Sequence, residues 1–257
     1  MDLQLSGKVV WITGGSKGIG LACAAAFLAE GARVAITSRA EANLARARAQ
    51  HPELIGVAAD LSQIGTAPAA VAAVQRQLGP IDILINSAGA ARRTLPLELT
   101  PAAWHAAMDA KYFTYIHAMD AVLPAMAERG SGNVVNVIGM GGKSATAMHL
   151  PGGAANSALM LASVGLASVY APKGLRINAI NPGATLTERV HEALQLEAKS
   201  QGVTEAEALA RGEARVPMRR YGRADEVAAV AVFLASERAS YVTGAIVPMD
   251  GGLTAVI

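Results

Sequence analysis

Short apolar segments alternate with longer helix-forming segments along the whole chain, and this alternation restricts the fold more than any other feature. Seven segments have the length and apolar character of strands that are covered on both faces. They are Lys8–Ile12, Arg33–Ser38, Leu54–Ala58, Ile81–Asn86, Asn133–Ile138, Arg176–Ile180 and Ala245–Pro248. The helical segments between them are Gly18–Glu30, Glu41–Gln50, Thr66–Leu78, Pro101–Glu128, Gly153–Ala171 and Ala224–Ser236. This order predicts an α/β fold: a single-domain, doubly wound, seven-stranded parallel sheet with helices on both faces.

The domain organisation follows from the same rhythm. No linker, repeat or low-complexity tract interrupts it, so we expect a single domain over residues 1–257. One polar, helix-prone segment, Leu186–Val216, stands outside the rhythm, between a predicted strand and the last predicted helix. We expect residues 186–216 to form a lid or substrate-covering segment within the domain.

Composition excludes several classes of function. The chain has 22 basic and 20 acidic side chains and a formal net charge of +2, so we expect no nucleic-acid partner. Cys23 is the only cysteine, which excludes an intrachain disulfide and a cysteine-based zinc site, and we expect no metal. No run of 18 apolar residues occurs, and Met1–Lys8 lacks a basic stretch followed by an apolar one. We therefore expect no membrane association and a cytoplasmic location.

A glycine-rich loop, Thr13–Gly20, follows the first predicted strand and opens the first predicted helix. Glycines let the backbone approach a pyrophosphate, and a helix N-terminus offers free N–H groups and a partial positive charge. The alternative is a tight turn in a fold that binds no cofactor. The strand–loop–helix context favours a dinucleotide site. Its expected contacts are Gly14, Ser16, Lys17, Gly18, Ile19 and Gly20.

The end of the second predicted strand distinguishes the two nicotinamide dinucleotides. An NAD site places an acidic residue there, which binds the ribose 2′-hydroxyl. This chain instead has Thr37, Ser38 and Arg39. The Arg39 guanidinium can pair with a 2′-phosphate, and Lys17 adds a second positive charge. We therefore expect NADP(H) as the cofactor, with Ser38 and Arg39 in contact with it; the alternative for Arg39 is a solvated surface arginine.

Further motifs follow the loop in a fixed order. They are Asp60-Leu61, Asn86-Ser87-Ala88-Gly89, Asn181-Pro182-Gly183 with Thr187, Tyr221-Gly222-Arg223, and Tyr241–Gly244 through Asp250–Gly252. Together with the loop, this set resembles the short-chain dehydrogenase/reductase family, in its 3-oxoacyl-carrier-protein-reductase-like branch, over nearly the whole chain. The resemblance implies a Rossmann domain and assigns further cofactor contacts. These are Asp60, Leu61, Asn86, Ala88, Gly89, Asn156, Pro182, Gly183 and Thr187.

The same resemblance has implications for assembly. In this family, two neighbouring long helices form a four-helix interface between subunits. They correspond here to Pro101–Glu128 and Gly153–Ala171. The resemblance therefore implies a homotetramer or a homodimer.

The active-site positions depart from the family pattern. The family uses a tetrad of asparagine, serine, tyrosine and lysine. Aligning Ala154–Leu159 with the family's Ala-Ser-Lys-Ala-Ala-Leu motif places Asn156 at the lysine, Gly152 at the tyrosine and Gly139 at the serine. In the long helix, Lys111 falls on the asparagine. All four positions are substituted, so the family's ordinary mechanism for ketones and alcohols cannot be transferred to this chain.

Two features provide replacement chemistry. Lysine and asparagine have exchanged places, since Lys111 stands at the asparagine position and Asn156 at the lysine position. A buried lysine beside a nicotinamide has a lowered pKa and can transfer protons. His149 precedes Asn156 by seven residues, the spacing that separates the acting tyrosine from the lysine in enoyl-reductase relatives. The alternatives are a lysine that points to solvent or caps a helix, and a loop histidine that faces solvent.

These residues lead to two main interpretations. The first is an NADP(H)-dependent oxidoreductase with a non-standard active site, formed by Lys111, His149 and Asn156. It would transfer a hydride to a small carbonyl compound or a conjugated double bond. The second is an inactive NADP-binding pseudoenzyme that acts as a sensor or scaffold. A lyase or dehalogenase-like enzyme is a third, weaker interpretation, because relatives of that kind lose the cofactor loop that this chain keeps.

Overall fold

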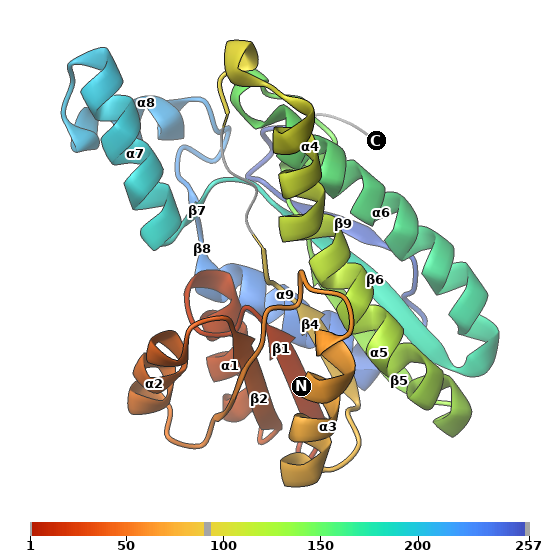
Figure 1. Ribbon diagram of the computed structural model, residues 1–257. Coiled ribbons are helices and arrows are strands. Elements are labelled where there is room, and N and C mark those ends of the chain that lie inside the picture. Colours follow the sequence, from red (N-terminus) through yellow and green to blue (C-terminus); the bar gives the residue numbers. More distant parts are fainter. Residues whose placement is uncertain (1, 90–93, 255–257) are drawn as a thin grey trace.

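A seven-stranded parallel sheet forms the centre of the molecule (Figure 1). The structure is a computed structural model and describes residues 2–89 and 94–254. The strand order is β3-β2-β1-β4-β5-β6-β9, and every neighbouring pair is parallel. The strands are β1 (Val9–Thr13), β2 (Arg33–Ser38), β3 (Ile55–Ala58), β4 (Ile83–Asn86), β5 (Gly132–Val137), β6 (Leu175–Pro182) and β9 (Ile246–Met249). The predicted fold class is confirmed.

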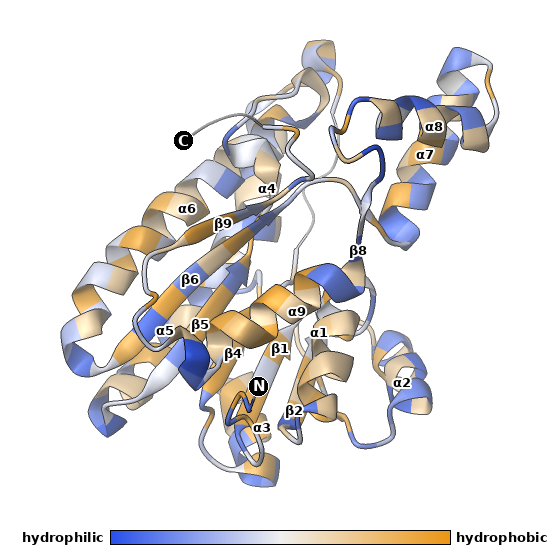
Figure 2. Ribbon diagram, turned by 180° about the vertical axis from the view of Figure 1, so that it is seen from behind, coloured by the Kyte–Doolittle hydropathy of each residue, from blue (hydrophilic) through white to orange (hydrophobic). Residues whose placement is uncertain are grey.

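Both faces of the sheet are covered because its strands are apolar on both sides. In β1, Val9 and Trp11 enter one core, whereas Val10 and Ile12 enter the other. Figures 1 and 2 show the two layers of helices from opposite sides. On one face lie α3 (Thr66–Leu78), α5 (Thr114–Arg129) and α6 (Leu150–Tyr170). On the other lie α1 (Gly18–Ala29), α2 (Glu41–Gln50) and α9 (Ala224–Ala235).

The segment predicted as one helix over Pro101–Glu128 is divided in the structure. It forms α4 (Pro101–Ala107), a π-helical turn (Met108–Phe113) and then α5. The Thr114 hydroxyl donates to the backbone oxygens of Asp109 and Ala110, at 3.1 and 3.4 Å. A hydroxyl that bonds back to the preceding turn interrupts the regular helical ladder. The single long helix was therefore a wrong prediction at this point.

Helix α6 begins three residues before its predicted start at Gly153, with Pro151 in its first turn. Proline suits a first turn because its missing N–H would have no partner there.

By length and composition alone, Ala147–Lys173 could cross a membrane. Core helices share this property, and α6 buries Leu159, Met160 and Ala167 in the core on its side of the sheet.

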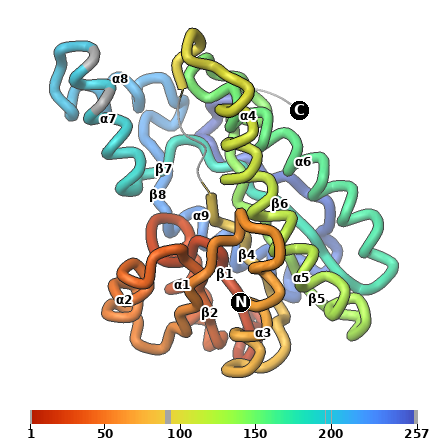
Figure 3. Tube along the Cα trace, viewed as in Figure 1, coloured from red at the N-terminus to blue at the C-terminus, as the bar shows by residue number. Residues whose placement is uncertain are grey.

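The segment 186–216 forms two helices, α7 (Glu188–Gln201) and α8 (Glu205–Ala214), beyond the carboxyl ends of the strands (Figures 1 and 3). A small apolar cluster of Leu194, Ala198 and Ala208 holds them together. A two-stranded sheet of β7 (Thr185–Leu186) and β8 (Gly222–Arg223) connects them to the domain. Short 3-10 turns lie at Pro96–Glu98, Met140–Gly142, Ala147–His149, Ala171–Lys173 and Glu237–Ala239. The role of this segment as a lid stays a prediction.

Candidate active site

The glycine-rich loop follows β1. The strand order of the sheet reverses between β1 and its neighbour β4. Ligands of doubly wound sheets bind at this switch point. Gly14 has a φ of +66°, and a Cβ on it would lie 2.6 Å from Ala88 Cα. A Cβ on Gly18 would come within 3.5 Å of Thr187 Cγ2. The loop is therefore packed against the segments after β4 and β6, as a shared cofactor site requires.

The N-terminus of α1 fits an anionic group. Lys17 is the N-cap and is exposed, and the first turn holds no acidic side chain. Arg39 is also exposed, directly after β2. Neither Lys17 nor Arg39 takes part in an ion pair within residues 2–89 and 94–254. Both cations are thus placed at the loop and strand end where the pyrophosphate and the 2′-phosphate of NADP(H) would lie.

Two other predicted contacts have structural roles in this fold. The Asn86 amide is buried, accepts from Thr13 Oγ1 at 3.1 Å and donates to Asn136 Oδ1 at 2.9 Å. It therefore ties β1, β4 and β5 together beneath the loop. Asp60 Oδ1 accepts from the Ser62 backbone N–H at 3.1 Å and from its hydroxyl at 2.7 Å, which closes the turn after β3.

Lys111 lies in the π-helical turn, and its side chain is directed into the protein. The residue is only 8% exposed. Its Nζ donates to Tyr115 Oη at 2.8 Å and to the Val137 carbonyl, at the end of β5, at 3.1 Å. The amine also lies 4.5 Å from the centre of the Tyr115 ring. The solvent-facing alternative for this lysine is excluded.

The surroundings of Lys111 disfavour its charge. Burial lowers its pKa from 10.5 to about 7, and the positive charge of Arg189 contributes in the same direction. Burial raises the pKa of the Tyr115 hydroxyl, whereas Arg189 opposes that shift. Lys111 can therefore exchange a proton near neutral pH, and Tyr115 stays a neutral phenol.

Asn156 and His149 both lie next to the glycines that follow β5. Asn156 Nδ2 donates to the Gly139 carbonyl at 3.5 Å, and Gly139 follows Val137 by two residues. A Cβ on Gly141 would lie 3.1 Å from His149 Cδ2 and 3.7 Å from Asn156 Nδ2. Lys111 and Asn156 thus donate to different carbonyls of one short segment, and His149 lies next to Gly141 of that segment.

The remaining predicted cofactor contacts also lie at the carboxyl ends of the strands. Pro182 ends β6, and its carbonyl lies 3.9 Å from the position of a Cβ on Gly139. Gly183 packs against Asp250, and Thr187 is the N-cap of α7. Of the Asn86–Gly89 motif, Gly89 contacts the π-helical turn, because a Cβ on it would overlap the Ala110 carbonyl oxygen. The structure brings the predicted contacts after β1, β4, β5 and β6 together at one edge of the sheet.

Two residues of this site were not predicted from the motifs. They are Tyr115, and Arg189 within the expected lid of residues 186–216. The spacing of four residues between Lys111 and Tyr115 was the available signal, since such pairs share a helix face. For Arg189, the signal was its position two residues after Thr187.

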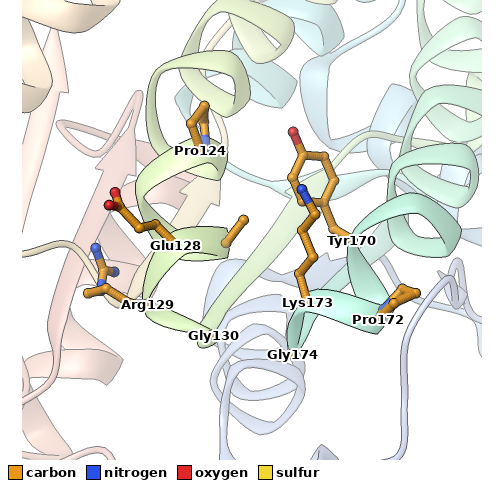
Figure 4. Close-up of a pocket in the computed structure, with 9 residues that line it drawn as sticks. Pro124, Glu128, Arg129, Gly130, Tyr170, Pro172, Lys173 and Gly174 are labelled. Atoms are coloured by element: carbon orange, nitrogen blue, oxygen red, sulfur yellow. The ribbon is translucent and has the colours of Figure 1, made fainter.

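A surface cavity of about 820 Å³ lies elsewhere, at the C-terminal ends of α5 and α6. Figure 4 shows Tyr170 and Lys173 side by side on one side of it, with Glu128 and Arg129 on the other. The Lys173 amine lies 5.7 Å from the centre of the Tyr170 ring. The predicted site residues do not line this cavity, which therefore has no part in the site described above.

Comparisons with known proteins agree with this geometry. The family model described as enoyl-(acyl carrier protein) reductase matches residues 14–254. D-threitol dehydrogenase of Mycolicibacterium smegmatis is 34% identical over 260 residues, covering 98% of this chain and 95% of the relative. Galactitol 2-dehydrogenase (L-tagatose-forming) of Cereibacter sphaeroides is 35% identical over 261 residues, covering 98% and 96%.

Solved structures show the same fold. The crystal structure of L-sorbose reductase from Gluconobacter frateurii, complexed with NADPH and L-sorbose, matches with a TM-score of 0.94 and 29% identity. The match covers 100% of both chains. With the family model and the dehydrogenases above, it shows that this chain belongs to the short-chain dehydrogenase/reductase family.

Proposed function

We propose that this protein is an NADP(H)-dependent oxidoreductase with a non-standard active site formed by Lys111, His149 and Asn156. A bound nicotinamide supplies or accepts a hydride, and the protein supplies the matching proton. One observation carries the proposal: Lys111 is a buried amine whose pKa of about 7 lies near physiological pH. A proton donor of this pKa suits reduction of a small carbonyl compound or a conjugated double bond.

The test is turnover of NADPH with a panel of small ketones and enones. Lys111→Met keeps the length of the side chain but removes the proton donor. Loss of a positioned acid lowers the rate by ~10²–10⁴-fold. Lys199→Met, an exposed change on α7, is the control. Unchanged turnover in Lys111→Met would refute the proposed role of this residue.

The cofactor proposal rests on the loop, the cations and named relatives. The solved L-sorbose reductase and an actinorhodin polyketide ketoreductase are both described with NADPH. In this chain, Arg39 and Lys17 supply charges for a 2′-phosphate. We expect NADPH to bind about ten- to a hundredfold more tightly than NADH, the worth of a charge-assisted pair. Calorimetry on the wild type and Arg39→Ala tests this, and an unchanged affinity ratio in Arg39→Ala would contradict it.

Asn156 fits the proposed cofactor site through an unpaired acceptor. The residue is 5% exposed, and its Oδ1 has no hydrogen-bond partner in the described part of the chain. Nδ2 donates to the Gly139 carbonyl. Rotating the amide by 180° would instead place Asn156 Oδ1 against the Gly139 carbonyl oxygen, which is unfavourable. Oδ1 therefore keeps its acceptor role and suits a hydroxyl donor, such as a ribose hydroxyl. A buried acceptor without a hydrogen-bond partner destabilises the fold, and a ligand that donates a hydrogen bond to Oδ1 would remove this cost.

His149 is the second acid in the proposal. Gly139 has a φ of +130°, a conformation that a serine side chain rarely adopts, and this supports a site built without the family's serine. His149 and Asn156 both lie next to Gly141, and an imidazole at this place can act as a general acid. His149→Gln separates its contribution from that of Lys111 in the same turnover assay.

A pseudoenzyme is the alternative function. The observation that favours it is that Lys111 already donates to two internal acceptors, Tyr115 and Val137, as a structural lysine would. All four aligned tetrad positions are also substituted. Tight NADPH binding without turnover of any ketone or enone would establish this alternative.

We also infer how the site is covered and how chains assemble. The segment 186–216 would cover a small-molecule substrate, because Thr187 joins its first helix to the phosphate loop. Exposed apolar residues on α6, Leu161, Val164 and Val169, support a homotetramer or homodimer through this helix. Light scattering measures the assembly, and a monomer at micromolar concentration would contradict it. We place this soluble enzyme in the cytoplasm.

A further inference from the structure

We propose that Tyr115 is a positioning residue, which together with the Val137 carbonyl fixes Lys111 as the proton-transfer group of the site. This inference rests on the proposed function and goes further, since it assigns a role to a residue outside the substituted tetrad. It is carried by the hydrogen bonds that join these three residues.

The directions of the hydrogen bonds follow from the number of protons. Tyr115 has one hydroxyl proton and donates it to the Val137 carbonyl at 2.5 Å. The phenolic oxygen is therefore left as an acceptor, and it receives a hydrogen bond from Lys111 Nζ at 2.8 Å. Lys111 also donates to the same carbonyl at 3.1 Å, and one carbonyl oxygen can accept both bonds. Two of the N–H bonds of Lys111 are thus fixed.

Tetrahedral nitrogen geometry determines what remains. A neutral amine has two N–H bonds and one lone pair, so with both N–H bonds fixed the lone pair occupies the remaining position. In the ammonium form, a third N–H bond occupies that same position. The bonds to Tyr115 and Val137 therefore hold one direction from which Lys111 can either give or take a proton. Val137 precedes Gly139 by two residues, and Asn156 donates to the Gly139 carbonyl. Lys111 is therefore held at the same end of β5 as Asn156.

The proton balance is simple. In reduction, a bound NADPH would give a hydride to the carbonyl carbon and be left as NADP⁺, while the Lys111 ammonium would give its third proton to the carbonyl oxygen. The products would be an alcohol and a neutral Lys111 amine. In oxidation, the neutral amine would take the alcohol proton, and NADP⁺ would accept the hydride. Tyr115 keeps its own proton throughout, because burial raises its pKa.

Several groups determine the charge of Lys111. The Tyr115 ring and hydroxyl favour the ammonium form, by cation–π contact and as an acceptor. Burial and Arg189 of α7 oppose it. Cys23 of α1 acts on Tyr115, Asp109 is exposed on the π-helical turn, and His149 lies beyond Gly141 at the same strand end. Removing the hydroxyl alone therefore lowers the pKa of Lys111 further.

The test measures the pKa of Lys111 directly. The chain has six lysines, so selective ¹³C labelling at Cε gives six NMR signals to follow against pH. In the wild type, one signal should titrate at about 7, and Lys111→Met should remove it. Tyr115→Phe keeps the ring and removes the acceptor. It should lower this pKa by about one unit, the worth of one hydrogen bond, and move the midpoint of the kcat–pH profile equally.

Tyr112→Phe is the matched control, since it makes the same chemical change in the π-helical turn and should leave both midpoints in place. NADPH affinity should not change in Tyr115→Phe. A purely structural Tyr115 would lower kcat at every pH without moving the midpoint, and this outcome would overturn the inference. A wild-type Lys111 signal that titrates above 9 would overturn it independently of any variant. Full turnover in Lys111→Met would instead refute the proposed function, while the NMR shift in Tyr115→Phe would still support the positioning role.

Discussion

Burial and a neighbouring cation both act against a positive charge on Lys111, and their sum makes the residue suitable for proton transfer near neutral pH. An exposed lysine would be almost fully protonated at pH 7 and a poor base. Burial alone lowers its pKa, and Arg189 adds a like charge from the first turn of α7. The helix of the expected lid therefore contributes to the electrostatics of the site.

Removing the Arg189 charge should raise the pKa of Lys111 above about 7, because the ammonium form loses a repulsive neighbour. The alkaline midpoint of NADPH-dependent reduction should move upward with it in Arg189→Gln. Arg211→Gln on α8 makes the same change of net charge and is the control. The midpoints of the two variants, measured at equal ionic strength, decide the question. Equal midpoints would show that the Arg189 charge does not reach Lys111.

At the scale of residues, motif spacing predicted Lys111 and Asn156 as site residues. It did not predict the groups to which they donate hydrogen bonds. The family pattern fixes which positions meet at the strand end, so an exchange of two residue types is visible in the sequence. Tyr115, the partner of Lys111, could not be predicted in this way, because a tyrosine on an apolar helix face is typical of a core residue. Tyr115 is indeed fully buried, but its hydroxyl donates to the carbonyl of Val137, which lies 22 residues further along the chain. No local pattern encodes that contact.

At the scale of elements, the π-helical turn orients Lys111. The seven strands of the main sheet were predicted to within two residues at every end, because apolar runs bounded by glycine and polar residues are strong signals. The π-helical turn was not predicted, since its apolar spacing resembles that of an ordinary α-helix. It depends on the Thr114 hydroxyl and on close packing against Gly89.

Gly89→Ala should disturb this turn. Gly89 has a φ of +90°, and a Cβ there would overlap the Ala110 carbonyl oxygen. We expect a loss of about 1–3 kcal/mol of stability and a fall in turnover as Lys111 shifts. Gly165→Ala is the control, because this exposed position in α6 has no neighbour within 4 Å of an added Cβ. It should be neutral or stabilising by up to about 1 kcal/mol. Equal melting temperatures and turnover in the two variants would contradict the close packing.

At the scale of the whole molecule, the buried amine links activity to stability. A group whose pKa is lower in the folded state binds fewer protons there than in the unfolded chain. The free energy of unfolding then rises with pH between the two pKa values. For Lys111, this window extends from about 7 to the usual 10.5. The site therefore lowers the stability of the fold at neutral pH, as many functional sites do.

Lys111→Met should consequently stabilise the protein while removing its activity. Methionine fills a similar volume, and the Val137 carbonyl keeps its hydrogen bond from Tyr115, so no buried backbone group loses its partner. Replacing a buried charged group by an apolar one of similar size can stabilise by about 1–4 kcal/mol. The gain should be largest at pH 7 and below, and should shrink as the pH rises toward 10.5, where wild-type Lys111 no longer differs in protonation between the two states. Urea unfolding at several pH values measures this, with the exposed Lys199→Met as control. If Lys111→Met is less stable than the wild type at every pH, the buried amine increases the free energy of unfolding, and burying its charge does not destabilise the fold.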